Sequence, residues 1–112
     1  MYTPKVGSLT VIAERARGTL HPPVLQPMAF KPGQGVLPAG LILENSASGL
    51  IPHDTGSIVG VNDAAVDTAV EDSGLVIIHG SALRDMLKAD TAGTFPDDAT
   101  LAALIALGVY PE

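Results

Sequence analysis

The sequence predicts an α+β fold: a small twisted, barrel-like β-sheet that carries two short helices and follows an extended N-terminal arm. Short apolar stretches separated by glycine-rich turns fill the middle of the chain, and two segments with helical spacing come after them. Five of the nine prolines lie before residue 33. A chain of 112 residues has the length of one domain. We therefore place the arm at residues 1–32 and the α+β domain at residues 33–112.

The expected arm differs from the rest of the chain in charge. Residues 1–35 carry four basic side chains and one acidic one, whereas residues 36–112 carry two basic and eleven acidic ones. Proline fixes φ and removes a backbone donor, so the arm should be neither helix nor sheet interior. Apolar and polar residues alternate from Leu9 to Glu14, which indicates a short segment able to pair as a strand. An unstructured tail is the alternative interpretation.

The strands of the body are predicted from three apolar runs, at residues 36–43, 57–62 and 74–80. Pro38 marks a bulge or a sheet edge in the first run. A polar turn at residues 44–49 predicts a hairpin whose second strand contains Leu50. The run at residues 74–80 shows no alternation, so we expect both of its faces to be buried.

Two helices are expected after these strands. Ser81 is a suitable N-cap for a short helix that places Leu83 and Leu87 on one face. Asp97 or Asp98 is a suitable cap for a second helix at residues 99–107. Gly108 then ends that helix in a left-handed conformation.

The composition excludes several classes of function. The chain has no cysteine, so disulfides and thiolate chemistry are excluded. A net charge of −6 and 4% aromatic residues without tryptophan argue against nucleic-acid binding. The apolar run at residues 101–110 is too short to cross a bilayer, and the N-terminus lacks the apolar core of a secretory signal. We therefore expect a protein that binds neither nucleic acid nor membrane and remains where it is made.

One string of residues resembles a catalytic motif. Asp54-Thr55-Gly56 matches the signature of aspartic proteases, in which two such carboxylates share a proton and activate water. However, Pro52 and His53 precede the aspartate, where an apolar strand should lead into it. We therefore favour a surface turn.

The remaining polar residues predict no catalytic, cofactor or metal site. His21, His53 and His79 lack the spacing of metal ligands, although His79 is a candidate for a subunit interface at the end of its strand. The acidic residues of segment 63–72 lack the pattern of a calcium loop and are expected to form a solvated face. We therefore expect a non-enzymatic protein that binds a partner through an extended segment laid along a sheet edge.

The order of the short strings in the body resembles a known family. Val36-Leu37-Pro38-Ala39-Gly40-Leu41-Ile42-Leu43 is followed by Ile58-Val59-Gly60-Val61 and by Leu75-Val76-Ile77-Ile78-His79-Gly80, and the second helix closes with Leu107-Gly108-Val109. This series resembles the head decoration proteins of tailed bacteriophages, of the lambdoid protein D type. The resemblance covers about residues 33–110.

The resemblance implies a structural role. Members of this family are small, tulip-like α+β domains without catalytic activity, and they form homotrimers at local three-fold axes of the expanded head. They cement the shell, and their N-terminal arms pair with segments of the major capsid protein. For this chain, the resemblance implies a component of the outer surface of the virion head that is made in the host cytoplasm. Its partners would be the major capsid protein and its own copies.

The residues expected to bind the capsid are chosen from their position in the arm and their local chemistry. These candidate arm residues are Leu9, Thr10, Val11, Ile12, Ala13, Glu14, Arg15 and Arg17. Two alternatives stay open: a dimeric, retroviral-type aspartic protease that uses Asp54-Thr55-Gly56, and another oligomeric virion component of a fibre or tail.

Overall fold

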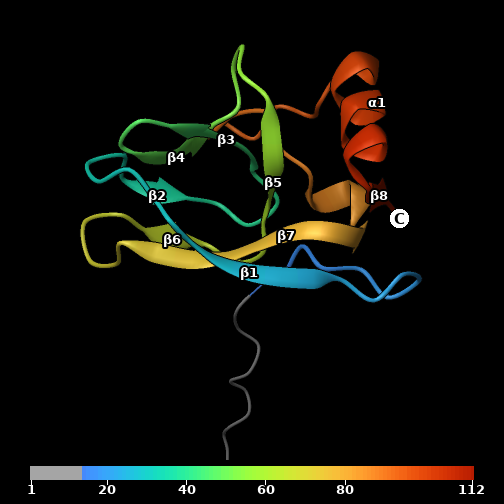
Figure 1. The fold of residues 1–112 in the computed structure, drawn as a ribbon, viewed down its shortest axis with the longest axis horizontal. Coiled ribbons are helices and arrows are strands. Elements are labelled where there is room, and N and C mark those ends of the chain that lie inside the picture. Colours follow the sequence, from blue (N-terminus) through green and yellow to red (C-terminus); the bar gives the residue numbers. More distant parts are fainter. Residues whose placement is uncertain (1–13) are drawn as a thin grey trace, which may run out of the picture.

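The computed structural model describes residues 14–112 (Figure 1). The sheet path runs β1-β7-β5-β3-β4, β8 joins β7, and β2 and β6 form a separate ladder. The elements are β1 (Val24–Ala29), β2 (Val36–Leu37), β3 (Ile42–Ser46), β4 (Gly49–Pro52), β5 (Ile58–Asn62), β6 (Val66–Asp67), β7 (Ser73–Ala82), the 3-10 turn η2 (Arg84–Met86), α1 (Asp98–Leu107) and β8 (Val109–Pro111).

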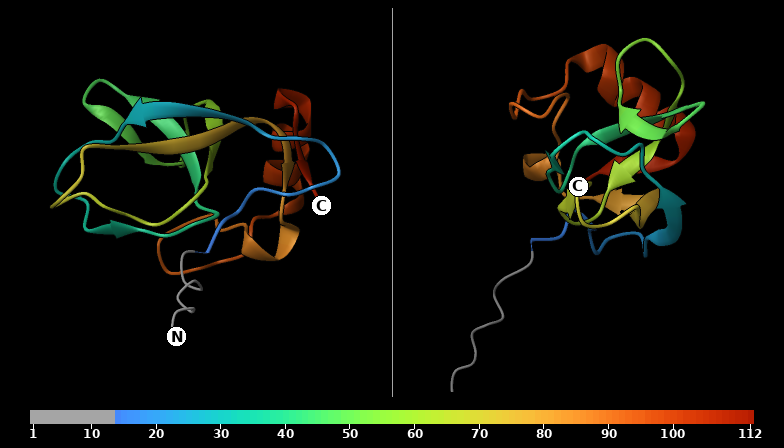
Figure 2. Two further views of the ribbon diagram at one scale, coloured as in Figure 1. Left: turned by 90° about the horizontal axis from the view of Figure 1, so that it is seen from below. Right: turned by 90° about the vertical axis from the view of Figure 1, so that its left-hand side faces the viewer.

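The main sheet curls back on itself. Along the path β1-β7-β5-β3-β4, each strand pairs antiparallel with the next. At the far edge, Leu50 of β4 forms a parallel bridge with Phe30, and the Lys31 N–H donates to the Leu50 carbonyl at 3.1 Å. The two views of Figure 2 show the strands wrapping around a common interior, with α1 at one end. The expectation of a β-rich body is therefore confirmed.

The expected boundary at residue 33 is wrong for the described part of the arm, because residues 14–32 belong to the body. β1 pairs with β7 from Val24 to Ala29, and Ala16 is fully buried. Pro27 is compatible with this arrangement because an edge strand pairs along one side only. Residues 1–13 of the expected arm lie outside the described residues.

The predicted strands form, with two differences. The run at residues 36–43 is divided between β2 and β3, because the chain turns at Gly40 with a φ of +86°. The β3–β4 hairpin, β5 and β7 form as expected. β7 is not buried on both faces throughout, since Val76 is fully buried whereas Leu75 is 38% exposed.

One of the two expected helices forms. In α1, the Asp97 side chain accepts from the Thr100 N–H at 2.8 Å, and Gly108 ends the helix with a φ of 107°. The helix expected after Ser81 is reduced to the single turn η2. The reason is that β8 pairs with residues 80–82 and keeps this part of the backbone extended.

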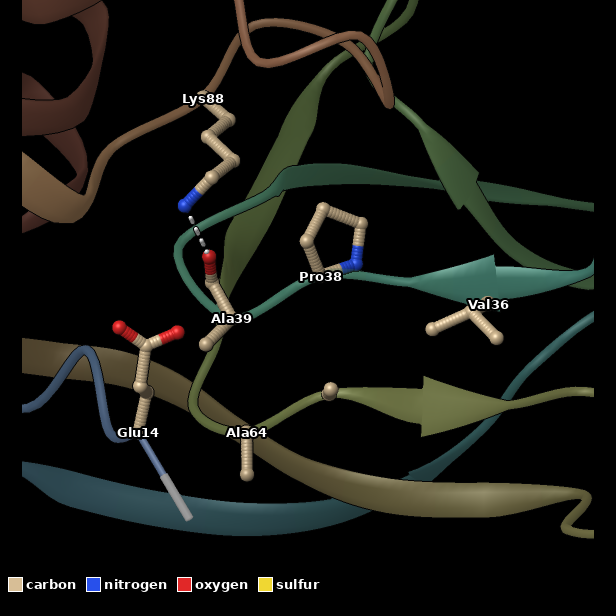
Figure 3. Close-up of a pocket in the computed structure, with 7 residues that line it drawn as sticks. Glu14, Val36, Pro38, Ala39, Ala64 and Lys88 are labelled. Carbon is tan, nitrogen blue, oxygen red and sulfur yellow. Dashed lines mark hydrogen bonds between the residues drawn. The ribbon is translucent and has the colours of Figure 1, made fainter. Parts of the chain in front are cut away.

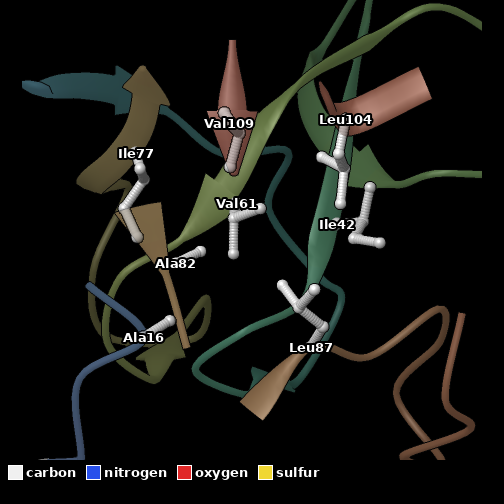
Figure 4. Close-up of a cluster of buried hydrophobic side chains, with 8 residues drawn as sticks. All are labelled: Ala16, Ile42, Val61, Ile77, Ala82, Leu87, Leu104 and Val109. Carbon is white, nitrogen blue, oxygen red and sulfur yellow. The ribbon is translucent and has the colours of Figure 1, made fainter. Parts of the chain in front are cut away.

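The apolar interior consists of two clusters. The first gathers residues of the sheet, the N-terminal segment, α1 and the residue that follows η2: Ala16, Ile42, Val61, Ile77, Ala82, Leu87, Leu104 and Val109 (Figure 4). The second lies among the strands nearer β4: Phe30, Leu37, Leu41, Leu43, Leu50, Val66 and Val76. Because Ala16 belongs to the first cluster, the core itself holds the start of the described chain in place.

Candidate functional site

Three polar residues fix the beginning of the described chain to the body. We call Arg15, Arg17 and Asp63 the N-terminal clamp. Asp63 directly follows β5, and its Oδ2 accepts from Arg17 Nη2 at 2.6 Å and from Arg15 Nη1 at 3.1 Å. Its Oδ1 accepts from Arg17 Nε at 3.1 Å, and its backbone carbonyl accepts from the Ala16 N–H at 2.8 Å. Consecutive residues are thus held by one aspartate, so the chain preceding them starts from a defined point on the body.

The clamp is an ion pair whose acidic member is buried. The Asp63 side chain is fully buried, whereas those of Arg15 and Arg17 are 46% and 37% exposed. Burial acts to raise the pKa of Asp63, but the hydrogen bonds and charges of Arg17 and Arg15 outweigh it and lower that pKa. The hydrogen bond to Asp63 in turn raises the pKa of Arg17. Two guanidinium groups face one carboxylate, so the clamp keeps an excess positive charge on an acidic chain.

A pocket of about 340 Å³ adjoins the clamp, and Glu14 lines it (Figure 3). Its wall is formed by the apolar residues Val36, Pro38, Ala39, Ala64 and Ala65. Lys88 is the second charged residue of the lining, and its Nζ donates to the carbonyls of Ala39 at 2.8 Å and Met86 at 3.0 Å. Because carbonyl oxygens carry no net charge, they orient the Lys88 ammonium group without neutralising it. The pocket can therefore take an apolar side chain, with a cation and an anion at its wall.

A buried asparagine shapes the apolar wall. Asn62 Nδ2 donates to the carbonyls of Leu37 at 3.1 Å and Pro38 at 2.9 Å. The Asn62 carbonyl accepts from the Gly40 N–H at 2.7 Å. Nothing in the local sequence of Asn62 or Lys88 points to partners about 25 to 50 residues away, so neither was predicted as a site residue. The prediction that Asp63 belongs to a solvated acidic face is wrong, because Asp63 is fully buried.

The Asp54-Thr55-Gly56 string forms an exposed loop between β4 and β5, in agreement with the predicted turn. Glu44, a largely buried residue of β3, organises this loop: its Oε1 accepts from the Asp54 N–H at 2.6 Å and the Gly56 N–H at 2.9 Å. These two hydrogen bonds lower the pKa of Glu44. His53 Nδ1 lies 3.2 Å from the same oxygen but without the alignment of a hydrogen bond. The carboxylate that organises this loop is therefore that of Glu44, outside the Asp54-Thr55-Gly56 string.

His79 lies on the exposed side of β7, in a small group of rings. Its ring meets that of Tyr110 edge-on, with centroids 6.0 Å apart. The His21 ring lies 5.1 Å from the same tyrosine, tilted by 49°. The sequence singled out His79, but nothing in the sequence joined it to the other two rings.

The structure brings together some of the candidate arm residues. Glu14, Arg15 and Arg17 meet at the clamp and the pocket, whereas residues 9–13 lie outside the described residues. Within residues 14–112, no three or more histidine, aspartate or glutamate side chains are placed to hold a metal ion. Over the same residues, no helix has the length and apolar character needed to cross a membrane.

The arrangement is suited to binding. An apolar pocket, an excess positive charge and the start of the described chain lie at one place on the surface. Comparison of the chain with protein-family models, curated proteins and solved structures finds no match.

Proposed function

We propose that this chain is a non-enzymatic decoration protein of a tailed-bacteriophage head. It binds as a homotrimer at local three-fold sites on the outer surface of the expanded shell and stabilises it. Its partners are the major capsid protein and its own copies. The observation that supports this proposal best is the N-terminal clamp, which attaches residues 1–13 to a fixed point beside an apolar pocket.

The clamp supports the proposal because it limits the volume around the body that residues 1–13 can reach. A segment attached to a rigid body at a defined point has a higher effective concentration near its target than one attached through a long linker. With three such segments on one trimer, weak individual contacts combine into tight binding. A three-fold arrangement of segments also favours a shell that presents the same symmetry.

The chemistry of the site indicates what the capsid segment should carry. The pocket wall is mostly apolar, so it favours an aliphatic side chain. Around the pocket, the three cations Arg15, Arg17 and Lys88 outnumber the two anions Asp63 and Glu14 by one, and this excess positive charge favours an acidic group next to that side chain. In this proposal, residues 1–13 pair with a capsid segment as a strand while the pocket receives one of its apolar side chains.

The proposal is tested by removing residues 1–13, because residues 14–112 include the clamp and both described core clusters. The full chain should co-sediment with expanded shells. The truncated chain should keep the same circular dichroism spectrum and lose most of this binding. Asp54→Asn is the matched control and should bind as the unaltered chain does. Equal binding by the truncated chain would contradict the role of residues 1–13, and failure of the full chain to bind would contradict the function.

The two alternatives are separated by further measurements. The exposed position of Asp54 in a loop organised by Glu44 gives no support to an aspartic protease, in which paired carboxylates meet at a shared site. A fibre or tail component would be distinguished by electron microscopy of virions carrying a labelled copy. Label on the head surface supports the decoration role, and label on the tail overturns it.

A further inference from the structure

We infer that a surface patch around Tyr110 is where one copy of this chain contacts another. We define the Tyr110 patch as Leu20, His21, Val24, His79 and Tyr110. The inference rests on the proposed function, because it assigns the contact that would hold the proposed trimer together. It goes further by naming the surface that mediates self-association.

The residues of the patch are held next to one another by contacts within one molecule. Both imidazole rings pack against Tyr110, at centroid distances of 5.1 Å for His21 and 6.0 Å for His79. Val24 of β1 lies opposite His79 of β7 in the antiparallel register, so their side chains are cross-strand neighbours. Leu20 precedes His21 in the loop that leads to β1.

The backbone of His21 and the ring of His79 are held from within the molecule, so this part of the surface is ordered before binding. The His21 N–H donates to Ser81 Oγ at 2.8 Å, and the His21 carbonyl accepts from the Ser81 N–H at 3.0 Å. The His79 ring lies against Gly108, where an added Cβ would come within 2.6 Å of its Cδ2 atom. A surface whose side chains are already ordered loses less conformational entropy on binding.

The patch exposes apolar area that a partner can cover. Leu20 is 74% exposed and Val24 is 50% exposed. Removing such area from water is favourable by about 25 cal/mol per Å². Tyrosine is enriched at protein interfaces, where its ring supplies contact area and its hydroxyl a polar end.

Charge identifies the occupant of the patch as a second copy. Around a rotation axis, a side chain near the axis meets its own counterparts, so charged groups there would repel one another. The five residues of the patch include no carboxylate, ammonium or guanidinium group, on a chain with a net charge of −6. Glu112 borders the patch, and its carboxylate accepts from the backbone N–H groups of Thr19 at 2.7 Å and Leu20 at 2.8 Å.

A comparison within the molecule supports the same conclusion. Val70 is 80% exposed, more than Val24, but it is followed directly by Glu71 and Asp72. Apposition of that turn with its own copies would bring carboxylates together, which is unfavourable. The Tyr110 patch combines exposed apolar area with the absence of formal charge, and that combination suits contact between identical acidic chains.

The test is a pair of matched substitutions, Val24→Lys and Val70→Lys, in the full chain. We expect the unaltered protein and Val70→Lys to be oligomeric by sedimentation equilibrium at tens of micromolar. Val24→Lys should raise the dissociation constant at least tenfold. Equal masses for the two variants, or a monomeric unaltered protein, would overturn the inference.

A second variant guards against a folding defect in β1. Leu20→Lys changes a residue that lies in a loop and is largely exposed, and its circular dichroism spectrum should match that of the unaltered chain. It should weaken self-association as Val24→Lys does, and an unchanged mass would again overturn the inference. Shell binding separates the two proposals. If the unaltered oligomer fails to bind shells, the decoration function fails while the patch stands; if Leu20→Lys remains an oligomer and shells are bound, the patch fails alone.

Discussion

Arg17 and Asp63 form a two-point ion pair between residues 46 positions apart, with Nη2–Oδ2 at 2.6 Å and Nε–Oδ1 at 3.1 Å. The pair is asymmetric in its exposure to solvent, because the carboxylate side chain is fully buried and the guanidinium side chain is 37% exposed. A buried charge that loses its partner is penalised much more than a charge that water can solvate. Replacing the two arginines and replacing the aspartate should therefore lower the free energy of unfolding by different amounts.

The first prediction compares these two removals. Arg15→Met combined with Arg17→Met leaves a buried carboxylate without its cations, and it should lower the free energy of unfolding by roughly 3–5 kcal/mol. Asp63→Asn leaves guanidinium groups that water can reach, and it should lower the free energy of unfolding by about 1–3 kcal/mol. Urea unfolding followed by circular dichroism measures both. A larger loss for Asp63→Asn than for the double variant would contradict the role of burial.

The second prediction concerns acid. The pKa of Asp63 is lower in the folded chain than its ordinary value, because Arg17 and Arg15 outweigh the effect of burial. Such a group stabilises the fold above its unfolded pKa of about 3.9, and this stabilisation is lost as the pH falls through the folded pKa. Asp63→Asn should therefore show a weaker decrease in stability than the unaltered chain as the pH falls from about 5 to 2. Parallel stability–pH curves for the two chains would argue against a native ion pair.

The third prediction concerns the loop that contains Asp54. Glu44→Gln removes the charged acceptor of the Asp54 and Gly56 N–H groups. Hydrogen exchange at these two amides should become faster, while the amides of β5 and β7 should keep their protection. Asp54→Asn is the control and should leave both rates unchanged, because its backbone still reaches Glu44. Faster exchange across the whole sheet in Glu44→Gln would show that Glu44 supports the fold and not the loop alone.

Local features of the fold were predictable from the sequence. The Asp97 cap and the Gly108 stop bound α1 correctly because capping depends on residues within one or two turns. The hairpin between β3 and β4 follows from a short polar turn between apolar runs. The helix expected after Ser81 failed for a nonlocal reason, since pairing of Ser81 with Tyr110 holds it in β7.

The site was less predictable because its contacts join distant residues. Asp63 lies close in sequence to other acidic residues, and its partners Arg15 and Arg17 are 48 and 46 positions away. The prolines of the N-terminal part correctly predicted that its described residues form no helix, but prolines do not exclude an edge strand. Pro27 of β1 pairs with Leu75 of β7. The pocket depends on Lys88 and Ala39, which no local pattern connects.

The fourth prediction tests the turn that forms the pocket wall. Gly40 has a φ of +86°, and a Cβ at this position would overlap the Met86 carbonyl oxygen, which also accepts from Lys88 Nζ. Gly40→Ala should therefore lower the free energy of unfolding by more than about 2 kcal/mol, because steric overlap adds to backbone strain. It should also weaken shell binding, because relief of the overlap displaces Lys88 from the pocket.

Gly33→Ala is the matched control for this prediction. Gly33 has a similar φ of +80°, but an added Cβ would meet no atom within 4 Å. Its cost should therefore be that of backbone strain alone, about 1–2 kcal/mol, and its shell binding should match that of the unaltered chain. Thermal unfolding and co-sedimentation of the two variants separate overlap from strain. Equal losses of stability would mean that the contact between Gly40 and Met86 contributes nothing beyond backbone conformation, and equal shell binding would remove the pocket from the capsid interface.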